Sequence, residues 1–181
     1  GDFMLQMLRS FDSDLSLSTV TANRDLKVVR ELLMHPMLLP GFNDSGAHLT
    51  NMAFYDGNLR SLKLAHENNE DSDVAYMVKR LTKDAAEVFG VSGGSIYEND
   101  KADLILVDPN ELKKYDGEKH VARVFREEFN HEQLVNRSDN VVPLVIIGGH
   151  VAWEDEKFSK DLGQEQFGEL LKSKISSNLN D

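Results

Sequence analysis

The sequence predicts an α/β fold, and three observations support this prediction. A strand-like segment, an amphipathic helical segment and a second strand-like segment follow one another between residues 15 and 42. Helical periodicity fills the middle of the chain, and a short strand and a β-hairpin follow in its last half. A strand, a helix and a strand joined by short connections form a βαβ unit, which implies parallel strands and a sheet covered on both faces.

The first elements are predicted from their apolar patterns. Residues 3–8 are apolar and rich in Met, which indicates the end of a helix. Residues 15–20 alternate with a period of two and contain β-branched side chains, as strands do. Asn23 is expected to cap a helix that ends before Pro36, because the residue before a proline is disfavoured in the α region. Residues 37–42 are expected to form the next strand.

The middle of the chain is predicted to be helical. Asp56 is expected to cap one helix, Ser72 is expected to cap a second, and Thr82 is expected to start a third. Each of these segments carries apolar residues on one face. Gly90 stands where a C-cap glycine belongs, so the third helix is expected to end there.

The last half of the chain is predicted to be richer in strands. Residues 102–107 form a compact apolar run that indicates a strand. Residues 141–147 and 150–153 are β-prone and flank Gly148-Gly149, which is typical of a two-residue hairpin turn. Residues 164–175 have the pattern of a terminal amphipathic helix.

These elements divide the chain into three parts. Residues 1–90 hold the strand–helix–strand unit and the helices, residues 91–160 hold the later strands, and residues 161–181 hold the terminal helix and tail. The strands are too few to complete either sheet. The chain also begins Gly1-Asp2-Phe3 rather than with Met. We therefore expect a fragment that is incomplete on its amino-terminal side.

Composition narrows the classes of partner and compartment. The 181 residues carry a formal net charge of −11, which argues against nucleic acid or an anionic membrane as partner, because phosphate binding needs clustered Lys and Arg. No apolar run approaches the roughly 20 residues that span a bilayer. The chain contains no Cys, so disulfides and thiolate metal sites are excluded, and a cytoplasmic location is expected.

The segment Gly41–His48 is the candidate site of chemistry. It follows an apolar run, and a Gly-bounded loop with a carboxylate and an imidazole is typical of the carboxyl end of a buried strand, where α/β folds place their active sites. Asp44 can accept and return a proton there. The alternative is an ordinary Asx turn, because Asn-Asp-Ser-Gly is also good turn chemistry.

The remaining polar residues give weaker signals. The six histidines form no H-x-H, H-E-x-x-H or other pair at metal-ligand spacing, so the sequence predicts no metal site within this chain. Arg60 is a candidate for binding a substrate carboxylate, although an arginine on a helix surface is more often solvated.

Several blocks resemble the carboxy-terminal part of amidohydrolase-superfamily enzymes of the D-aminoacylase (N-acyl-D-amino-acid deacylase) branch. In chain order, the blocks are Asn43-Asp44-Ser45-Gly46-Ala47-His48, Thr82 with Ala86 and Phe89-Gly90, Ala102–Pro109, Val135-Asn136-Arg137-Ser138, and Val145–Trp153. They are similar to that branch's S-D-x-G-A-H, T-x-x-P-A-x-x-F-G, A-D-L-V-V-x-D-P and closing V-x-V-N-G segments. Each block alone is loose, but together they follow the order of the family and cover residues 23–171.

The sequence also departs from the family pattern at three positions. Asn43 replaces the usual Ser, Ala85 stands where Pro is frequent, and Asn99 stands where a turn Gly is common. None of these changes the carboxylate of Asp44. They therefore bear on the substrate subtype more than on the class of enzyme.

The resemblance implies a fold and a reaction. The fold would be the last strands and helices of a (β/α)8 metal-dependent-hydrolase barrel, followed by the carboxy-terminal strands of a small β-sandwich. Asp44 would be the general acid/base that takes a proton from a zinc-activated water and returns it to the leaving amine. Ser45 and His48 would contact the substrate or shape the loop.

The resemblance also implies partners. The substrate would be an N-acyl-D-amino acid, and the zinc ligands would lie on earlier strands outside this chain. The chain would therefore need the missing amino-terminal half of the enzyme, and would be inactive alone. A homo-oligomer is possible within this family.

Two alternatives stay open. One is a non-catalytic α/β interaction domain in which residues 41–48 form only a turn. The other is a ring-opening amidohydrolase of the dihydropyrimidinase or dihydroorotase kind, which would share the aspartate and the closing strands. The continuation Gly46-Ala47-His48 favours the deacylase branch over the ring-opening enzymes.

Overall fold

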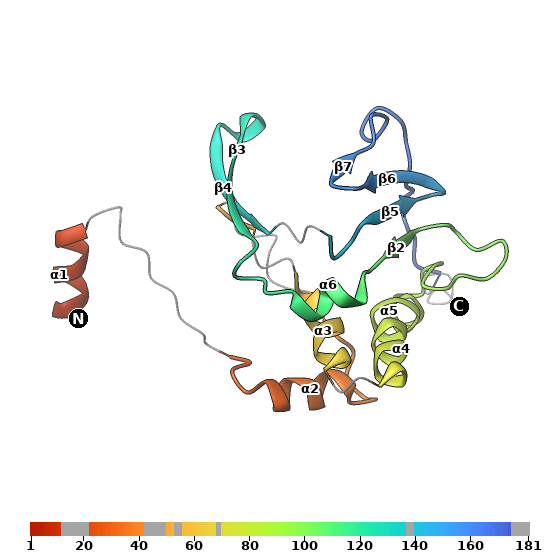
Figure 1. Ribbon diagram of the computed structural model, residues 1–181, viewed down its shortest axis with the longest axis horizontal. Helices are drawn as coiled ribbons and strands as arrows, with labels where there is room; N and C mark the ends of the chain where they lie inside the picture. The colour runs from red at the N-terminus through yellow and green to blue at the C-terminus, as the bar shows by residue number, and fades with distance from the viewer. Residues whose placement is uncertain (12–21, 42–49, 53–55, 68–69, 137–139, 175–181) are drawn as a thin grey trace, which may run out of the picture.

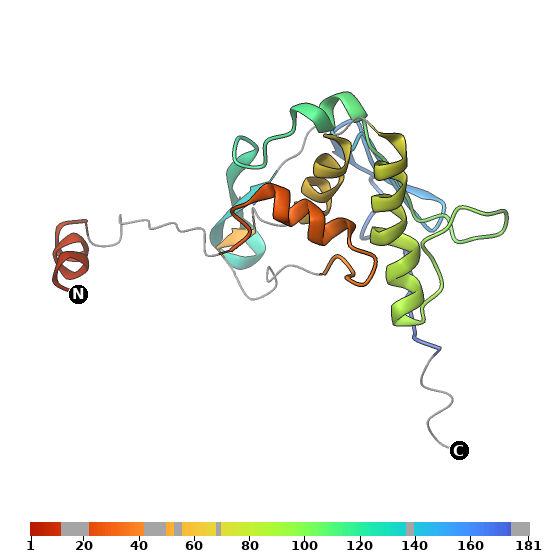
Figure 2. The same ribbon diagram turned by 90° about the horizontal axis from the view of Figure 1, so that it is seen from below.

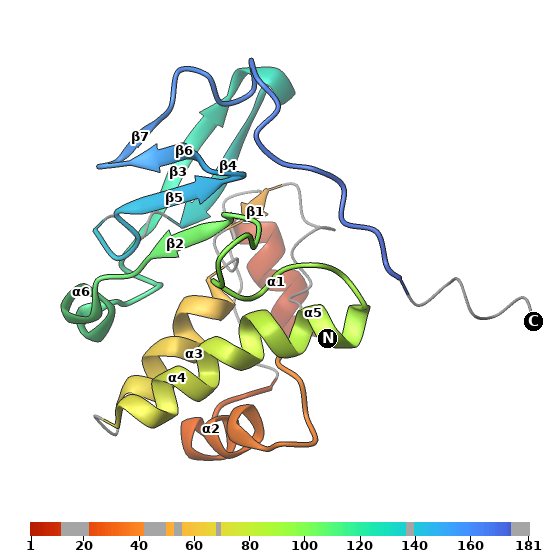
Figure 3. The ribbon, with the colours of Figure 1, turned by 90° about the vertical axis from the view of Figure 1, so that its right-hand side faces the viewer.

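The computed structural model describes residues 1–11, 22–41, 50–52, 56–67, 70–136 and 140–174. Within these residues the chain is a mixed α/β structure, with a group of helices on one side and two small sheets on the other (Figures 1 and 3). The coarse prediction of an α/β fold is therefore confirmed. The strands among these residues do not close into a barrel, so the (β/α)8 architecture stays a prediction.

The helices form a compact group below the sheets. They are α2 (Leu26–Met34), α3 (Gly57–His66), α4 (Asp71–Lys79) and α5 (Ala85–Phe89). A π-helical segment, η3 (Arg80–Asp84), joins α4 to α5, so these residues form one continuous helix that packs beside α3 (Figure 2). The helix ends at Gly90, whose φ of 64° lies in the left-handed region. The predicted glycine C-cap is confirmed.

A shared core joins the helices to the strand-bearing part of the chain. A short helix, α6 (Pro109–Lys114), follows β2 (Leu104–Leu106) and begins with a capping carboxylate from Asp108. The buried residues of this core are Leu62, Ala65, Met77, Leu112, Tyr115 and Val141. Because this set draws on α3, α4, α6 and the segment before β5, the helices and the later strands are packed as one body.

The first sheet is a twisted hairpin with a short third strand. It contains β1 (Asn51–Met52), β3 (Val121–Arg126) and β4 (His131–Asn136), in the order β1-β4-β3. The hairpin β3–β4 is antiparallel and closes through a 3-10 turn, η4 (Glu127–Phe129), whereas β1 pairs with β4 in parallel. The sequence analysis did not predict this hairpin.

The second sheet confirms the predicted carboxy-terminal hairpin. It contains β2, β5 (Leu144–Ile147), β6 (His150–Glu154) and β7 (Lys157–Phe158), all antiparallel and in that order. Gly148 and Gly149 join β5 to β6 with φ values of 56° and 84°. Two successive positive φ values are the requirement of a type I′ hairpin turn, which explains why glycine stands at both positions.

Of the predicted amino-terminal strand–helix–strand unit, the structure confirms only the helix. Residues 15–20 lie outside the described part of the chain, and residues 37–41 form a turn and irregular backbone rather than a strand. The physical reason is Pro40, which has no N–H to donate to a neighbouring strand. The helix between them is capped by Asp25 rather than Asn23, since the Asp25 carboxylate accepts bonds from two backbone N–H groups of α2.

Two other helix predictions need correction. The helix predicted to be capped by Ser72 has Glu70 at its N-cap, two residues earlier, and Thr82 lies inside the continuous helix instead of starting a new one. Residues 164–174 are not helical. They run as an extended arm in which the Phe167 ring stacks on His150 and the Lys174 N–H donates to the Gly90 carbonyl at 2.9 Å.

The amino-terminal helix, α1 (Asp2–Phe11), confirms the helix predicted around residues 3–8 and stands apart from the body (Figures 1 and 2). None of its residues is buried. Among the helices that the structure describes, none has the length and apolarity needed to cross a bilayer.

Candidate functional site

Most of the predicted catalytic loop lies outside the described residues. Asp44, Ser45 and His48 fall within residues 42–49, so the structure gives no geometry for them. Arg60 is the one predicted site residue that the structure places. It lies on α3 and belongs to a polar cluster with Asp56, Tyr115 and Asn136.

Asp56 and Arg60 form an ion pair on the first turn of α3. Arg60 Nε donates to Asp56 Oδ2 at 2.8 Å, and this bond and the Asp56 charge raise the pKa of Arg60. The Asp56 side chain is 5% exposed, whereas that of Arg60 is 55% exposed. Asp56 occupies the predicted N-cap position, but its carboxylate caps no backbone N–H of the helix. It receives side-chain donors instead.

Tyr115 brings a second donor to the same carboxylate from 59 residues away. Its hydroxyl donates to Asp56 Oδ2 at 2.7 Å, with Asn136 Oδ1 a further acceptor at 3.1 Å. Burial, and then the bond to Asp56, raise the pKa of Tyr115 well above its usual value. The phenol therefore stays protonated and acts as a donor. His120 stacks against the Tyr115 ring at a centroid distance of 5.3 Å.

Gly117 closes the cluster at a point where no side chain fits. A Cβ atom added there would lie 2.2 Å from Asp56 Oδ2 and 2.7 Å from an Arg60 guanidinium nitrogen. The Gly117 carbonyl accepts a bond from Asn136 Nδ2 at 2.8 Å. Sequence reasoning missed Tyr115, Gly117 and Asn136. The Asp116-Gly117 pair is a turn signal, but nothing local to it indicates the contact with α3.

The polar cluster borders a groove of about 690 Å³, which we call the α2–α3 groove. Its apolar lining, which we call the floor, consists of Leu26, Val29 and Leu33 from α2 and Leu64 from α3. Its charged lining, which we call the rim, consists of Arg60, Lys63, Glu67, Lys114, Asp116, Glu118 and Lys119. An apolar floor with a charged rim of both signs suits an amphipathic ligand better than a small anion.

The described residues do not fit a metal centre. Among them, no three His, Asp or Glu side chains come close enough together to hold a metal ion. The polar cluster also lacks an activated nucleophile, because the Asp56 carboxylate is already occupied by the two donors from Arg60 and Tyr115. Its chemical role is therefore to fix α3 against the segment that follows α6.

Arg80 is a buried cation with incomplete hydrogen bonding. It is 2% exposed, and one guanidinium nitrogen donates to the Tyr76 hydroxyl at 3.1 Å. Its Nε and second terminal nitrogen have no acceptor within the described part of the chain. The guanidinium also lies over the Tyr76 ring, 5.2 Å from its centroid. Arginine stays charged in proteins, so this position carries a desolvation cost.

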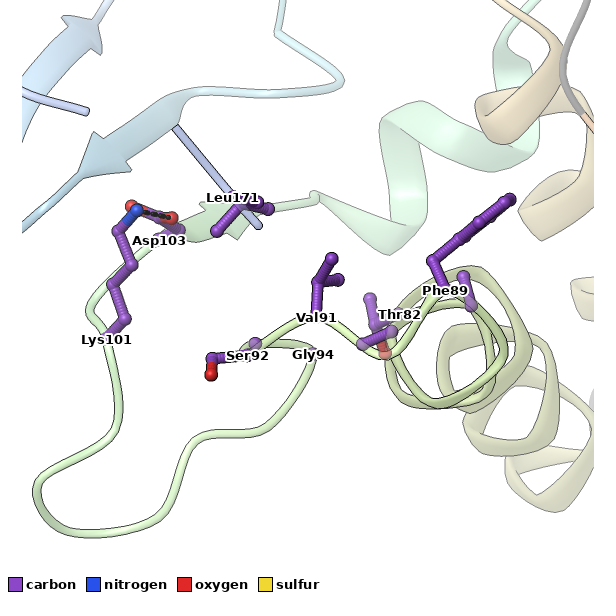
Figure 4. Close-up of a pocket in the computed structure, with 11 residues that line it drawn as sticks. Thr82, Phe89, Val91, Ser92, Gly94, Lys101, Asp103 and Leu171 are labelled. Atoms are coloured by element: carbon purple, nitrogen blue, oxygen red, sulfur yellow. Dashed lines mark ion pairs between the residues drawn. The ribbon is translucent and has the colours of Figure 1, made fainter. Parts of the chain in front are cut away.

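A second cavity, of about 300 Å³, is lined by residues of two of the resemblance blocks (Figure 4). Thr82, Ala86 and Phe89 line it from the helix, and Lys101 and Asp103 line it from the start of β2. Leu171 of the carboxy-terminal arm also lines it.

Asp103 connects the strand block to the hairpin block. Its carboxylate accepts the Gly148 N–H at 2.7 Å and pairs with Lys101 at 3.2 Å, and these contacts lower the pKa of Asp103. The Val145–Trp153 block thus contacts the Ala102–Pro109 block through this carboxylate. The Thr82–Gly90 block lines the same cavity as Asp103.

Three mycobacterial proteins are similar to this chain. Two come from strains of Mycobacterium tuberculosis and one from Mycobacterium bovis, and all three carry the name uncharacterized protein. Each is 30% identical to the chain over 176 residues, which is 94% of this chain and 28% of the relative. The chain thus spans little more than a quarter of these relatives. No protein-family model and no solved structure matches it.

Proposed function

We propose that this chain is the carboxy-terminal part of a metal-dependent amidohydrolase that hydrolyses the amide bond of an N-acyl-D-amino acid. The observation that carries the proposal is the ordered succession of sequence blocks from Asn43 to Trp153. The hydrogen bond between Asp103 and the Gly148 N–H supports it, because this bond joins the Ala102–Pro109 block to the Val145–Trp153 block. The greater length of the mycobacterial relatives leaves room for an amino-terminal part.

In the proposed reaction, Asp44 moves one proton. It takes the proton from the attacking water while the water oxygen bonds to the amide carbonyl carbon. The C–N bond then breaks, and Asp44 delivers the proton to the leaving nitrogen, so the products are a carboxylic acid and a free amino acid. General acid–base catalysis of this kind contributes about 10²–10⁴-fold to the rate. Ser45 and His48 would contact the substrate or shape the loop around Asp44.

The metal belongs to the part of the enzyme outside this chain. Zinc supplies polarisation of the carbonyl and a lower pKa of the attacking water in such reactions. The described residues do not form a ligand set, so the proposal assigns none of them to zinc.

Arg60 is left out of the proposed machinery. Its guanidinium is paired with the buried Asp56 carboxylate, so a substrate carboxylate would have to compete with an existing ion pair. This contact favours a structural role for Arg60 over the substrate-binding role considered from the sequence.

The test is a substrate panel assayed on the longer polypeptide loaded with zinc. The panel contains N-acetyl-D-amino acids, their L-enantiomers, and cyclic amides such as dihydropyrimidines and dihydroorotate. We expect release of free amino acid from the D-substrates and no activity from the 181-residue chain alone. Opening of the cyclic amides alone would identify the ring-opening alternative. A folded, zinc-loaded protein that is inactive on every substrate would favour the interaction domain.

A further inference from the structure

We infer that α1 docks into the α2–α3 groove of its own chain. The inference begins with the two faces of α1. Five of its six apolar residues lie along one side of the helix, Phe3, Met4, Met7, Leu8 and Phe11, and the sixth, Leu5, lies at the edge of this side. Its polar residues lie on the opposite side and are Asp2, Gln6, Arg9 and Ser10. An amphipathic helix of this kind normally packs its apolar side against another element.

The apolar side of α1 has no cover in the described structure. Phe3 is 73% exposed, Leu8 is 46% exposed and Phe11 is 54% exposed. A helix of ten residues is marginal in water without tertiary contacts, because nucleation is costly and few hydrogen bonds offset it. The helical state of α1 therefore calls for a docking surface.

The α2–α3 groove has the complementary properties. Its floor is apolar, and Leu26 on that floor is 57% exposed. Its rim carries lysines and carboxylates that can stay in water while the floor is covered. Docking of an amphipathic helix into an apolar groove is a common mode of peptide recognition.

The segment that connects α1 to α2 favours the chain's own α1 over a second copy as the occupant of the groove. The residues between Phe11 and Leu26 span up to about 45 Å when extended, at roughly 3.3 Å per residue. Asn23 and Leu26 are themselves part of the groove lining, so the connection ends at the groove. A tethered segment has an effective concentration in the millimolar range, which is about a thousandfold above that of a second copy present at micromolar concentration. The tether therefore favours the chain's own α1.

Disulfide trapping tests the inference without background, because the chain contains no Cys. We would pair Met4→Cys or Leu8→Cys with Leu26→Cys or Leu33→Cys, so that more than one helix register is sampled. The matched control is Gln6→Cys with Leu33→Cys, which places the thiol on the polar side of the same helix. In a glutathione buffer, the best apolar-side pair is expected to form an intramolecular disulfide at least about tenfold more readily than the control, because bridging needs close Cα atoms.

The outcomes of the trapping experiment are distinct. Monomeric cross-linked chains that favour the apolar-side pairs support the inference. Equal trapping of the apolar-side and polar-side pairs, or no trapping, overturns it. Disulfide-linked dimers as the main product would show that a second copy occupies the groove, and would also overturn it.

Hydrogen exchange tests the docking of α1 independently and needs no engineered disulfide. The amides of α1 are expected to exchange at least about tenfold more slowly than those of an unstructured peptide. Leu26→Asp is expected to remove this protection, and it is tolerated by the fold because Leu26 is largely exposed. Val88→Asp is the control, since Val88 is similarly exposed on α5 and lies outside the groove. Unprotected α1 amides in the unmodified chain would contradict docking. The result does not depend on the catalytic role proposed for Asp44.

Discussion

At the scale of single residues, the buried Asp56 carboxylate organises a polar cluster that joins α3 to the segment after α6. It accepts donors from Arg60 and Tyr115, and Gly117 lets the backbone approach it closely. The Asp56–Arg60 pair was within reach of sequence reasoning, because residues four apart on a helix are neighbours. The contribution of Tyr115 was not, since no local pattern links positions 59 residues apart.

Gly117→Ala is expected to destabilise the chain. The added Cβ would overlap Asp56 Oδ2, and relief of that overlap requires a shift of the ion pair, at a cost of about 1–3 kcal/mol. Gly57→Ala is the matched control, because nothing lies within 4 Å of its Cβ position, and we expect a change within about 0.5 kcal/mol. Urea unfolding of both variants measures the difference. Equal stabilities would contradict the described packing.

Tyr115 is expected to make the fold sensitive to alkali. Its pKa is raised in the folded state, so its contribution is complete below the unfolded value of about 10 and is lost as the pH rises above it. The free energy of unfolding should therefore fall more steeply above pH 10 in the unmodified chain than in Tyr115→Phe. The limit for one group is about 1.4 kcal/mol per pH unit. Tyr97→Phe, at an exposed position, should keep the steep slope.

At the scale of elements, prediction worked where one or two residues determine the backbone. The Gly90 cap and the Gly148-Gly149 turn were predicted because positive φ values favour glycine. The β3–β4 hairpin was missed because its alternation is masked by charges such as Arg123 and Glu132, which pair across the strands at 3.3 Å. Residues 164–174 have helical periodicity, but contacts with the β5–β6 turn and Gly90 hold them extended.

Two arginines, Arg80 in the helix from α4 to α5 and Arg60 in α3, are expected to change the free energy of unfolding in opposite directions when they are replaced by Met. Arg80→Met is expected to leave the free energy of unfolding unchanged or to raise it, because it removes a buried charge whose hydrogen bonding is incomplete within the described chain. Arg60→Met on α3 is expected to lower it by about 1–2 kcal/mol, since the buried Asp56 then loses its cation. Thermal melts of the two variants make the comparison. Strong destabilisation by Arg80→Met would indicate an acceptor that the described residues do not show.

At the scale of the whole molecule, the α/β class and the late strands were predictable, but the packing of the helices against the two sheets was not. Periodicity reports which face of an element is buried, not which distant element covers it. The (β/α)8 barrel stays a prediction from the family resemblance, since the described strands form two small sheets that do not close into a barrel. The same limit applies to the candidate site, because Asp44 lies outside the described residues and the proposed metal would be held by residues outside this chain.

The most direct test of the proposed function is the value of kcat/KM for an N-acetyl-D-amino acid after Asp44→Asn in the longer, zinc-loaded polypeptide. We expect a fall of at least about 100-fold, because proton transfer to the leaving nitrogen is lost while the fold is kept. Asp161→Asn, at an exposed turn position after β7, is the matched control and should stay within about twofold. If Asp44→Asn keeps kcat/KM within about twofold of the unmodified enzyme, Asp44 is not the acid/base and the account is wrong.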